Sequence, residues 1–199
     1  RSRLHEGHDH SVPPTEGHVA AQLLTIPTNV SVVNLDEQRL SGTLPATLPP
    51  HIAVLDLSEN KISGTVPPTI FSAGSALEVL KLDENFNISG TLPTTLARIG
   101  SSSSETTRPP ELSLVAMLRV SGTLPTQLAR LASLGSLNVL SNDVSGSLPT
   151  QLGGLPLTSL ANLGYNSISG AIPTELGRLV NVGQLKLKEN SLSGFLPTQ

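Results

Sequence analysis

The chain has 199 residues, a net charge of −3 and no cysteine. This length suits one domain, the weak negative charge leaves no electrostatic footprint for nucleic acid or an anionic membrane, and the lack of cysteine excludes disulfides and thiolate metal sites. Only 2% of the residues are aromatic, so a core must be built from Leu, Ile and Val, and no apolar run approaches the roughly 20 residues of a membrane helix.

Residues 1–18 are polar and rich in histidine, and we predict a tail that precedes a folded domain over 19–199. The chain begins at Arg1 rather than Met, so either a leader was removed or the chain starts inside a longer one. Imidazole and carboxylate side chains in this tail suit zinc or copper; they are His5, Glu6, His8, Asp9 and His10. Their spacing matches no defined site, so a solvated tail is the favoured interpretation, and no metal or cofactor is assigned.

One turn recurs seven times along the rest of the chain. It reads SGTLP or a close variant, and it starts at Ser41, Ser63, Ser89, Ser121, Ser145, Ser169 and Ser193. Successive turns are 22 to 32 residues apart. A repeat of this length indicates a solenoid, because one coil cannot bury its own leucine face but stacked coils can.

The stretch before each turn predicts a short strand. In "VGQLKLKENSLSG", Leu185 and Leu187 alternate with Lys, so both leucines point to one face. We expect the leucines at such positions to be buried: Leu55, Leu57, Leu80, Leu82, Leu137, Leu185 and Leu187. After the Pro of each turn, an apolar spacing of three, as in "TELGRL", predicts a 3₁₀ or short helical turn.

An Asn follows most of these strands, where the chain turns while still inside the coil. The Asn side chain has two donors and an acceptor, enough to satisfy backbone groups that no sheet serves there. The predicted structural ladder is Asn60, Asn85, Asn142, Asn166 and Asn190, with Gln38 in the first repeat. We expect Asn142 and Asn190 to be buried.

The pattern LxxLxLxxNxLSGxIP, repeated from Val30 to Gln199, resembles the plant-type leucine-rich repeat. The resemblance implies an α/β repeat solenoid. This is a right-handed superhelix of about seven coils, with a concave parallel sheet, short 3₁₀ or helical turns on the convex side and extra short strands after the turn. Members usually carry cysteine-paired caps, whereas this chain has no cysteine and stops just after its last turn. We therefore expect that the chain continues or that a partner covers this end.

Three repeats depart from the pattern. The third has one residue too many, with Phe86 and Asn87 where one residue is usual. The fourth carries a Ser-rich insert over 100–110, which predicts a loop, and Met117 falls near the position of its missing Asn. The sixth, "LTSLANLGYNSISG", has an ambiguous register. These coils are the expected places for bulges or specific contacts.

Two rows of surface residues suggest ligands. Acidic residues recur just before the ladder Asn; they are Asp36, Glu37, Glu59, Asp83, Glu84 and Glu189. They could attract a basic partner or Ca²⁺, although a charged, soluble rim is the simpler interpretation. A second row follows the Gly of the turn and comprises Thr43, Thr65, Thr91, Thr123 and Ser147. A regular Thr array can order water, yet Thr also suits strand edges, and the uneven repeat lengths interrupt the array.

No HExxH, GxSxG, phosphate-loop or GxGxxG motif occurs, so we expect no catalytic activity. The favoured function is a protein-binding module or a structural subunit of a larger assembly, with no nucleic-acid partner. The strand residues that vary between coils are the candidate partner contacts: Asp56, Lys81, Asn138, Lys186 and Lys188. The alternative is a secreted ice-binding solenoid. An extracytoplasmic location is expected, where the sequons at Asn29 and Asn87 would be candidate glycosylation sites.

Overall fold

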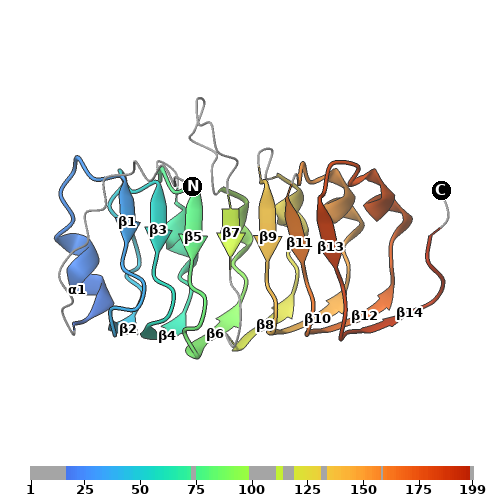
Figure 1. Ribbon diagram of the computed structural model, residues 1–199, viewed down its shortest axis with the longest axis horizontal. Coiled ribbons are helices and arrows are strands. Elements are labelled where there is room, and N and C mark those ends of the chain that lie inside the picture. Colours follow the sequence, from blue (N-terminus) through green and yellow to red (C-terminus); the bar gives the residue numbers. More distant parts are fainter. Residues whose placement is uncertain are drawn as a thin grey trace, which may run out of the picture.

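The computed structural model describes residues 17–72, 75–98, 111–113, 119–130, 134–157 and 159–197. The histidine-rich tail up to residue 16, the insert at 100–110 and Met117 lie outside the described residues. The described chain winds through a row of stacked coils, with the N-terminal helix at one end and the last coil at the other (Figure 1). This is the expected α/β solenoid of leucine-rich-repeat type.

Two parallel sheets run the length of the solenoid. The first sheet holds the strands before each turn, which are β1 (Val32–Asn34), β3 (Val54–Asp56), β5 (Val79–Lys81), β7 (Glu111–Ser113), β9 (Ser136–Asn138), β11 (Leu160–Asn162) and β13 (Gln184–Lys186). The second sheet holds the strands of the turn, which are β2 (Ser41–Thr43), β4 (Lys61–Thr65), β6 (Asn87–Thr91), β8 (Arg119–Thr123), β10 (Asp143–Ser147), β12 (Ser167–Ala171) and β14 (Ser191–Ser193). In both sheets each strand pairs with its counterpart in the next coil, so the extra strands implied by the repeat are present (Figure 1).

Short 3₁₀ helices follow the prolines of the turns and confirm the expectation from the apolar spacing of three. They are η1 (Pro68–Phe71), η2 (Thr94–Arg98), η3 (Thr126–Arg130), η4 (Thr150–Gly154) and η5 (Thr174–Arg178). Pro149 and Pro173 stand just before their helices with φ of −65° and −64°, extended residues that end the strand segment. Each 3₁₀ helix buries an aliphatic side chain against the coil interior, which is Ile70 in η1 and a leucine, such as Leu152 or Leu176, in the others.

The core is a column of aliphatic side chains between the sheets and the 3₁₀ helices. The predicted burial of Leu55, Leu57, Leu80, Leu82 and Leu137 is confirmed, since each is at most 1% exposed. The prediction is wrong for Leu185, which is 39% exposed, and Leu187 is only half-buried. Both lie in the last described coil. A leucine that points into a coil is covered on one side by the coil that follows, and no described residue takes that place beyond this coil.

The helix α1 (Val19–Leu24) covers the other end of the core, and the repeat pattern gave no sign of it. It buries Val19 and Leu23 completely and packs beside β2. His18 just before it forms a parallel bridge with Ser41, so the backbone at this point already continues the second sheet. Helix α1 thus covers the N-terminal end of the core, and no cysteine takes part.

The recurring SGT sequence is explained by contacts between neighbouring coils. Gly90 has φ +94°, and a Cβ there would lie 2.9 Å from the methyl of Thr65 in the preceding coil. The Gly therefore supplies both the left-handed backbone and the space for that methyl group. The hydroxyl of Ser63 donates to the carbonyl oxygen of Gly42 one coil back, at 3.2 Å. At the first coil the ring of His18 occupies the place of the threonine over Gly42.

The structure also resolves two irregular coils. In the third, Phe86 is left 49% exposed ahead of β6, so the extra residue is absorbed outside the core. In the sixth, Ala161 pairs with Leu137 and Leu185 and is 3% exposed, and Leu163 takes the second core position. An alanine at a leucine position is what made this register ambiguous in the sequence.

Candidate functional site

Four members of the asparagine ladder link their coil to the one before it. The amide nitrogen of Asn85 donates to the carbonyl oxygens of Leu82 in its own coil, at 3.0 Å, and Leu57 in the preceding coil, at 2.8 Å. Its carbonyl oxygen accepts from the N–H of Ile62, also in the preceding coil, at 3.0 Å. The same three kinds of bond are made by Asn60, Asn166 and Asn190.

Burial of this ladder differs along the array. Asn60, Asn85 and Asn142 are buried, the last as expected, and the amide of Asn142 donates to the carbonyl oxygens of its own coil. The expectation that Asn190 is buried is wrong, because it is half-buried in the last described coil. The ladder is structural in geometry and presents no group to a ligand.

The residue before each ladder position has a left-handed backbone. These residues, with φ between 52° and 58°, are Glu37, Glu59, Glu84, Ser141, Tyr165 and Glu189. The turn directs successive side chains of this type to the same rim of the first sheet. Four of the six are glutamates, so the backbone turn itself gathers negative charge on that rim.

The outward face of the first sheet is the candidate interaction surface. Its register aligns one row through the strand ends, comprising Asn34, Asp56, Lys81, Ser113, Asn138, Asn162 and Lys186, of which Asn162 is buried. Four of the five predicted contact residues fall in this row, and Lys188 follows two positions after Lys186 along the chain. The frame beneath the row repeats, whereas the side chains on it change from coil to coil.

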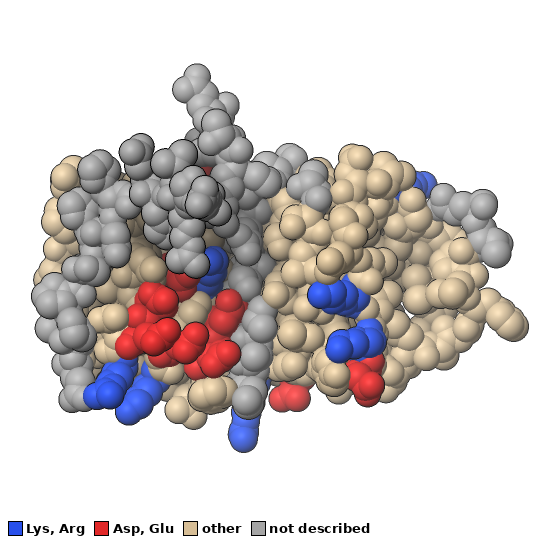
Figure 2. Space-filling view, in the orientation of Figure 1, with Lys and Arg blue, Asp and Glu red and all other residues tan. Residues whose placement is uncertain are grey.

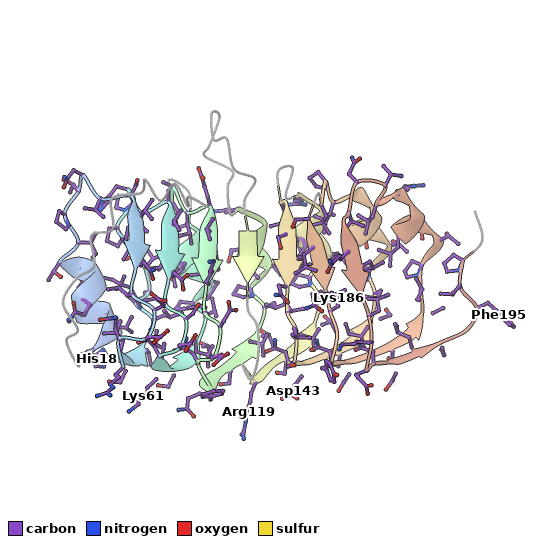
Figure 3. The ribbon with its side chains drawn as sticks, viewed as in Figure 1. His18, Lys61, Arg119, Asp143, Lys186 and Phe195 are labelled. Atoms are coloured by element: carbon purple, nitrogen blue, oxygen red, sulfur yellow. The ribbon has the colours of Figure 1, made fainter. Side chains whose placement is uncertain are left out.

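Two of the predicted contact residues, Asp56 and Lys81, form an ion pair with each other. The Lys81 Nζ lies 3.3 Å from the Asp56 carboxylate, and both side chains are about one-fifth to one-third exposed. Lys186, on β13, is exposed on this face (Figure 3). The Lys188 ammonium lies 4.6 Å from the centre of the Tyr165 ring, an exposed cation–π pair between neighbouring coils.

Charge is distributed unevenly over this face. Acidic side chains gather below β1, β3 and β5, whereas basic side chains stand below β13 with an acidic side chain beneath them (Figure 2). Lys186, Lys188 and Glu189 are exposed in that coil. We define the acidic cluster as Asp36, Glu37, Glu59, Asp83 and Glu84. The pKa of Glu59 is raised above its ordinary value, first by the negative charge of Glu37, then by partial loss of hydration, and then by Glu84 and Asp36. Like charges are therefore held close together at one end of the face.

Sequence reasoning missed Tyr165. It found the acidic row because glutamate recurs at one repeat position, and Tyr165 occupies that same position with a different side chain. Its aromatic character in a chain with a single tyrosine was the signal that could have identified it.

The second sheet presents the predicted Thr row. Thr43, Thr65, Thr91 and Thr123 are exposed, and Ser147, Ala171 and Ser193 continue the row. Charged residues stand at the first position of several strands of the same sheet. Lys61, Arg119 and Asp143 are exposed there and project from the lower edge of the solenoid (Figure 3).

Both sequon asparagines are exposed. Asn29 lies in the turn between α1 and β1, and Asn87 is the first residue of β6. Asn29 also lines a hollow of about 320 Å³ together with Ile26, Pro27, Val30, Val32, Val33 and Asn34.

Within the described residues, no group of three or more His, Asp or Glu side chains could hold a metal ion. Nor does any helix in that part of the chain have the length and apolar character needed to cross a membrane.

Comparison with known proteins agrees with the architecture. The sequence pattern of the Leucine Rich Repeat family matches residues 51–73. No curated protein matches the chain. Among solved structures, the ectodomain of the plant receptor kinase GASSHO1/SCHENGEN3 from Arabidopsis thaliana, in complex with CASPARIAN STRIP INTEGRITY FACTOR 2, is similar at 27% identity and a TM-score of 0.75. The match covers 92% of this chain and 21% of that one.

Two further structures are similar. The Arabidopsis receptor kinase HAESA, solved with the peptide hormone IDA and the co-receptor SERK1, is 28% identical with a TM-score of 0.64, covering 90% of this chain and 32% of that one. A plant ice-binding protein is 21% identical with a TM-score of 0.61, covering 92% of this chain and 63% of that one, a likeness of fold alone. The chain thus spans between about a fifth and a third of the length of these two receptor chains.

Proposed function

Because this chain is a leucine-rich-repeat protein of the plant type, we propose that it binds an extended polypeptide along the outward face of the first sheet and catalyses no reaction. The face is built on a constant frame of parallel strands. Its outward residues differ between coils, so they are free to encode a ligand without disturbing the core. Solved structures of this architecture include the receptor kinase HAESA in complex with a peptide hormone.

The polarity of charge on this face carries the proposal. The acidic cluster occupies the coils of β1, β3 and β5, whereas Lys186 and Lys188 stand in the coil of β13. Charges of one sign at one end attract opposite charges on a ligand, steer its approach and fix its direction. We infer that the ligand carries a basic segment over the first three coils and an acidic segment, or a terminal carboxylate, over the last.

The span of the face sets the length of the ligand. Seven neighbouring parallel strands at about 4.8 Å per spacing separate β1 from β13 by about 29 Å. An extended peptide rises about 3.3 Å per residue, so about nine residues reach from the acidic cluster to Lys186. Shorter peptides would contact only one of the two charged ends.

We further propose that the protein works outside the cytoplasm, on a cell surface, in a secretory lumen or after secretion. The similar GASSHO1/SCHENGEN3 structure is a receptor ectodomain, and both sequon asparagines of this chain are exposed. Its whole partner would then be a secreted or surface polypeptide.

A second candidate is ice binding through the second sheet, and the exposed row of Thr43, Thr65, Thr91 and Thr123 favours it. A water lattice needs a flat face without long charged side chains. Lys61 and Arg119 stand on the same sheet as this row (Figure 3). Peptide binding is therefore the better proposal. Inhibition of ice recrystallisation by a protein that binds no peptide would reverse this order.

The test uses nine-residue peptides of identical composition. One carries three Lys at one end and three Glu at the other, and a second alternates the same residues. Isothermal titration calorimetry at low salt should show tighter binding of the block peptide, and binding that weakens as salt rises. Equal affinity for the two peptides would refute the polarity, and no binding of an array of unrelated nine-residue peptides would refute the peptide-binding function.

Protein variants locate the binding face. Replacing Lys186 and Lys188 by Glu should weaken the block peptide about tenfold, as should replacing Glu37 and Glu59 by Gln. Lys61→Glu is the control, because Lys61 is also exposed but belongs to the second sheet. A loss of affinity in Lys61→Glu as large as in the first-sheet variants would mean that net charge, and not this face, governs binding.

A further inference from the structure

In the part of the chain that the structure describes, β1 and β13 are the two edge strands of the first sheet, and β1 is the N-terminal one. Among the described residues β1 pairs only with β3, so its other side presents backbone N–H and C=O groups without a neighbouring strand. Val32 on this strand is 60% exposed. An exposed edge strand with an apolar side chain is a template for pairing with another chain. Helix α1 packs beside β2 of the second sheet and gives β1 no partner strand.

A hollow of about 320 Å³ lies along this edge. The turn at Pro27 and Asn29 forms one part of its lining, and β1 forms another through Val32 and Val33. Val30 donates from its N–H to the carbonyl oxygen of Pro27 at 3.0 Å, which closes the turn and sets Asn29 at its tip. The Asn29 side chain is exposed and lines the hollow.

Asn29-Val30-Ser31 is also a glycosylation acceptor sequence. We propose that Asn29 carries an N-linked glycan whose first sugars lie in this hollow and shield the open edge of β1. Sugar rings have apolar faces that pack on Val and Ile side chains, and their hydroxyls can bond edge backbone groups. The inference rests on the extracytoplasmic location proposed above but not on peptide binding.

The chemistry is transfer from a lipid-linked donor. The Asn29 side-chain nitrogen attacks the anomeric carbon of an oligosaccharide attached to a lipid pyrophosphate. A carbon–nitrogen bond forms, the bond from that carbon to the pyrophosphate oxygen breaks, and the amide nitrogen loses one proton. The lipid pyrophosphate leaves. The transferase of the secretory lumen acts on the chain before folding, and the exposed turn accommodates the product.

Asn87 is a matched comparison within the same chain. Its sequon, Asn87-Ile88-Ser89, is exposed at its asparagine, but β6 lies between β4 and β8 inside the second sheet. A glycan there covers no open strand edge. Removing the Asn29 sequon and removing the Asn87 sequon should therefore have different consequences for self-association.

The experiment expresses the full chain behind a secretory leader in a eukaryotic host. Intact mass before and after endoglycosidase digestion, with mapping of glycopeptides, should place a glycan on Asn29. Asn29→Gln and Ser31→Ala should each remove it, the second while keeping the Asn side chain. Light scattering should then show that both variants self-associate as their concentration rises, with a weight-average mass at least twice that of the monomer. Asn87→Gln should stay monomeric.

A third variant isolates the cause. Adding Val32→Lys to Asn29→Gln should restore the monomer, because an edge lysine opposes strand pairing. If a variant is not secreted, wild-type protein deglycosylated after folding serves for the same measurement. A glycan absent from Asn29, or glycan-free protein as monomeric as the glycosylated form, would overturn the inference. The peptide-binding assay is unaffected by either result, so the two proposals fail separately.

Discussion

Replacing Asn85 by Ala tests how much a buried ladder residue contributes to stability. Asn85 is 0% exposed, and its amide serves the carbonyl oxygens of Leu57 and Leu82 while its oxygen serves the N–H of Ile62. Each buried backbone group left without a partner costs about 1–3 kcal/mol, and part of this is offset because the amide of Asn85 no longer has to be desolvated. We expect a net loss of about 2–4 kcal/mol.

The same substitution elsewhere in the ladder calibrates the argument. Asn142→Ala should cost about 1–3 kcal/mol, since Asn142 is buried. Asn190→Ala should cost about 1 kcal/mol, because Asn190 is half-buried and water can replace its amide. Asn138→Ala is the control. Asn138 lies on the outward face, where its oxygen accepts one long bond of 3.4 Å from the N–H of Leu140, so a change within about 0.5 kcal/mol is expected.

Urea unfolding followed by far-ultraviolet circular dichroism is the assay, because the chain has no Trp and one Tyr. With a slope of about 2 kcal/mol per molar urea, a loss of 3 kcal/mol lowers the midpoint by about 1.5 M. The reasoning is refuted if Asn85→Ala costs no more than the Asn138 control. It is also refuted if Asn85 and Asn190 variants lose the same amount, since burial would then not determine the cost.

Gly90→Ala should lower stability by about 1–3 kcal/mol, because the new Cβ combines a φ of +94° with a 2.9 Å approach to the threonine methyl of the preceding coil. Gly154→Ala, with open space around it, should be neutral or stabilising in the same urea assay, and equal losses at the two sites would contradict the packing account. Glu59→Gln should raise the melting temperature at pH 7 and low salt. The raised pKa of Glu59 means that its ionised form is disfavoured in the fold, so this gain should disappear as the pH falls below the ordinary value of 4.5 in calorimetric melts at several pH values. Ser141→Gly should stabilise by up to about 1 kcal/mol by removing a left-handed serine with φ 58°, and a clear loss in urea would show that the serine side chain does more than tolerate this turn.

The repeat pattern in the sequence was sufficient to predict most of the strands and buried leucines. Leu55 and Leu57 alternate with polar residues, so their burial follows from strand geometry within one coil. Leu185 has the same pattern and is 39% exposed, because its burial depends on a neighbour beyond its own coil. A repeat pattern describes each coil in isolation. It does not indicate which coils have a neighbour on both sides. The helix at Val19–Leu24 was not predicted because its sequence does not follow the repeat.

The candidate surface was predictable in composition but not in arrangement. The recurring acidic position before the ladder Asn indicated a charged row, and stacking places equivalent residues of neighbouring coils side by side. The pairing of Lys81 with Asp56 required the register of β3 against β5, which places the two residues opposite each other. The place of Tyr165 required knowing that its left-handed turn matches that of the glutamates. Such features depend on backbone angles that one sequence does not display.

The hydrogen bonds of the asparagine ladder run from an Asn back to the preceding coil, and this implies an order in which the coils are completed during synthesis. Asn85 completes the hydrogen bonds of Leu57 and Ile62, which belong to the coil made earlier by the ribosome. Asn190 likewise completes those of Leu163 and Ile168. Asn60 does the same for Leu35 and Leu40 of the first coil, so these coils emerge with backbone groups that the next coil completes. During synthesis, each new coil would therefore complete the backbone hydrogen bonds of the coil before it. Its own backbone groups would stay without these partners until the next coil is made.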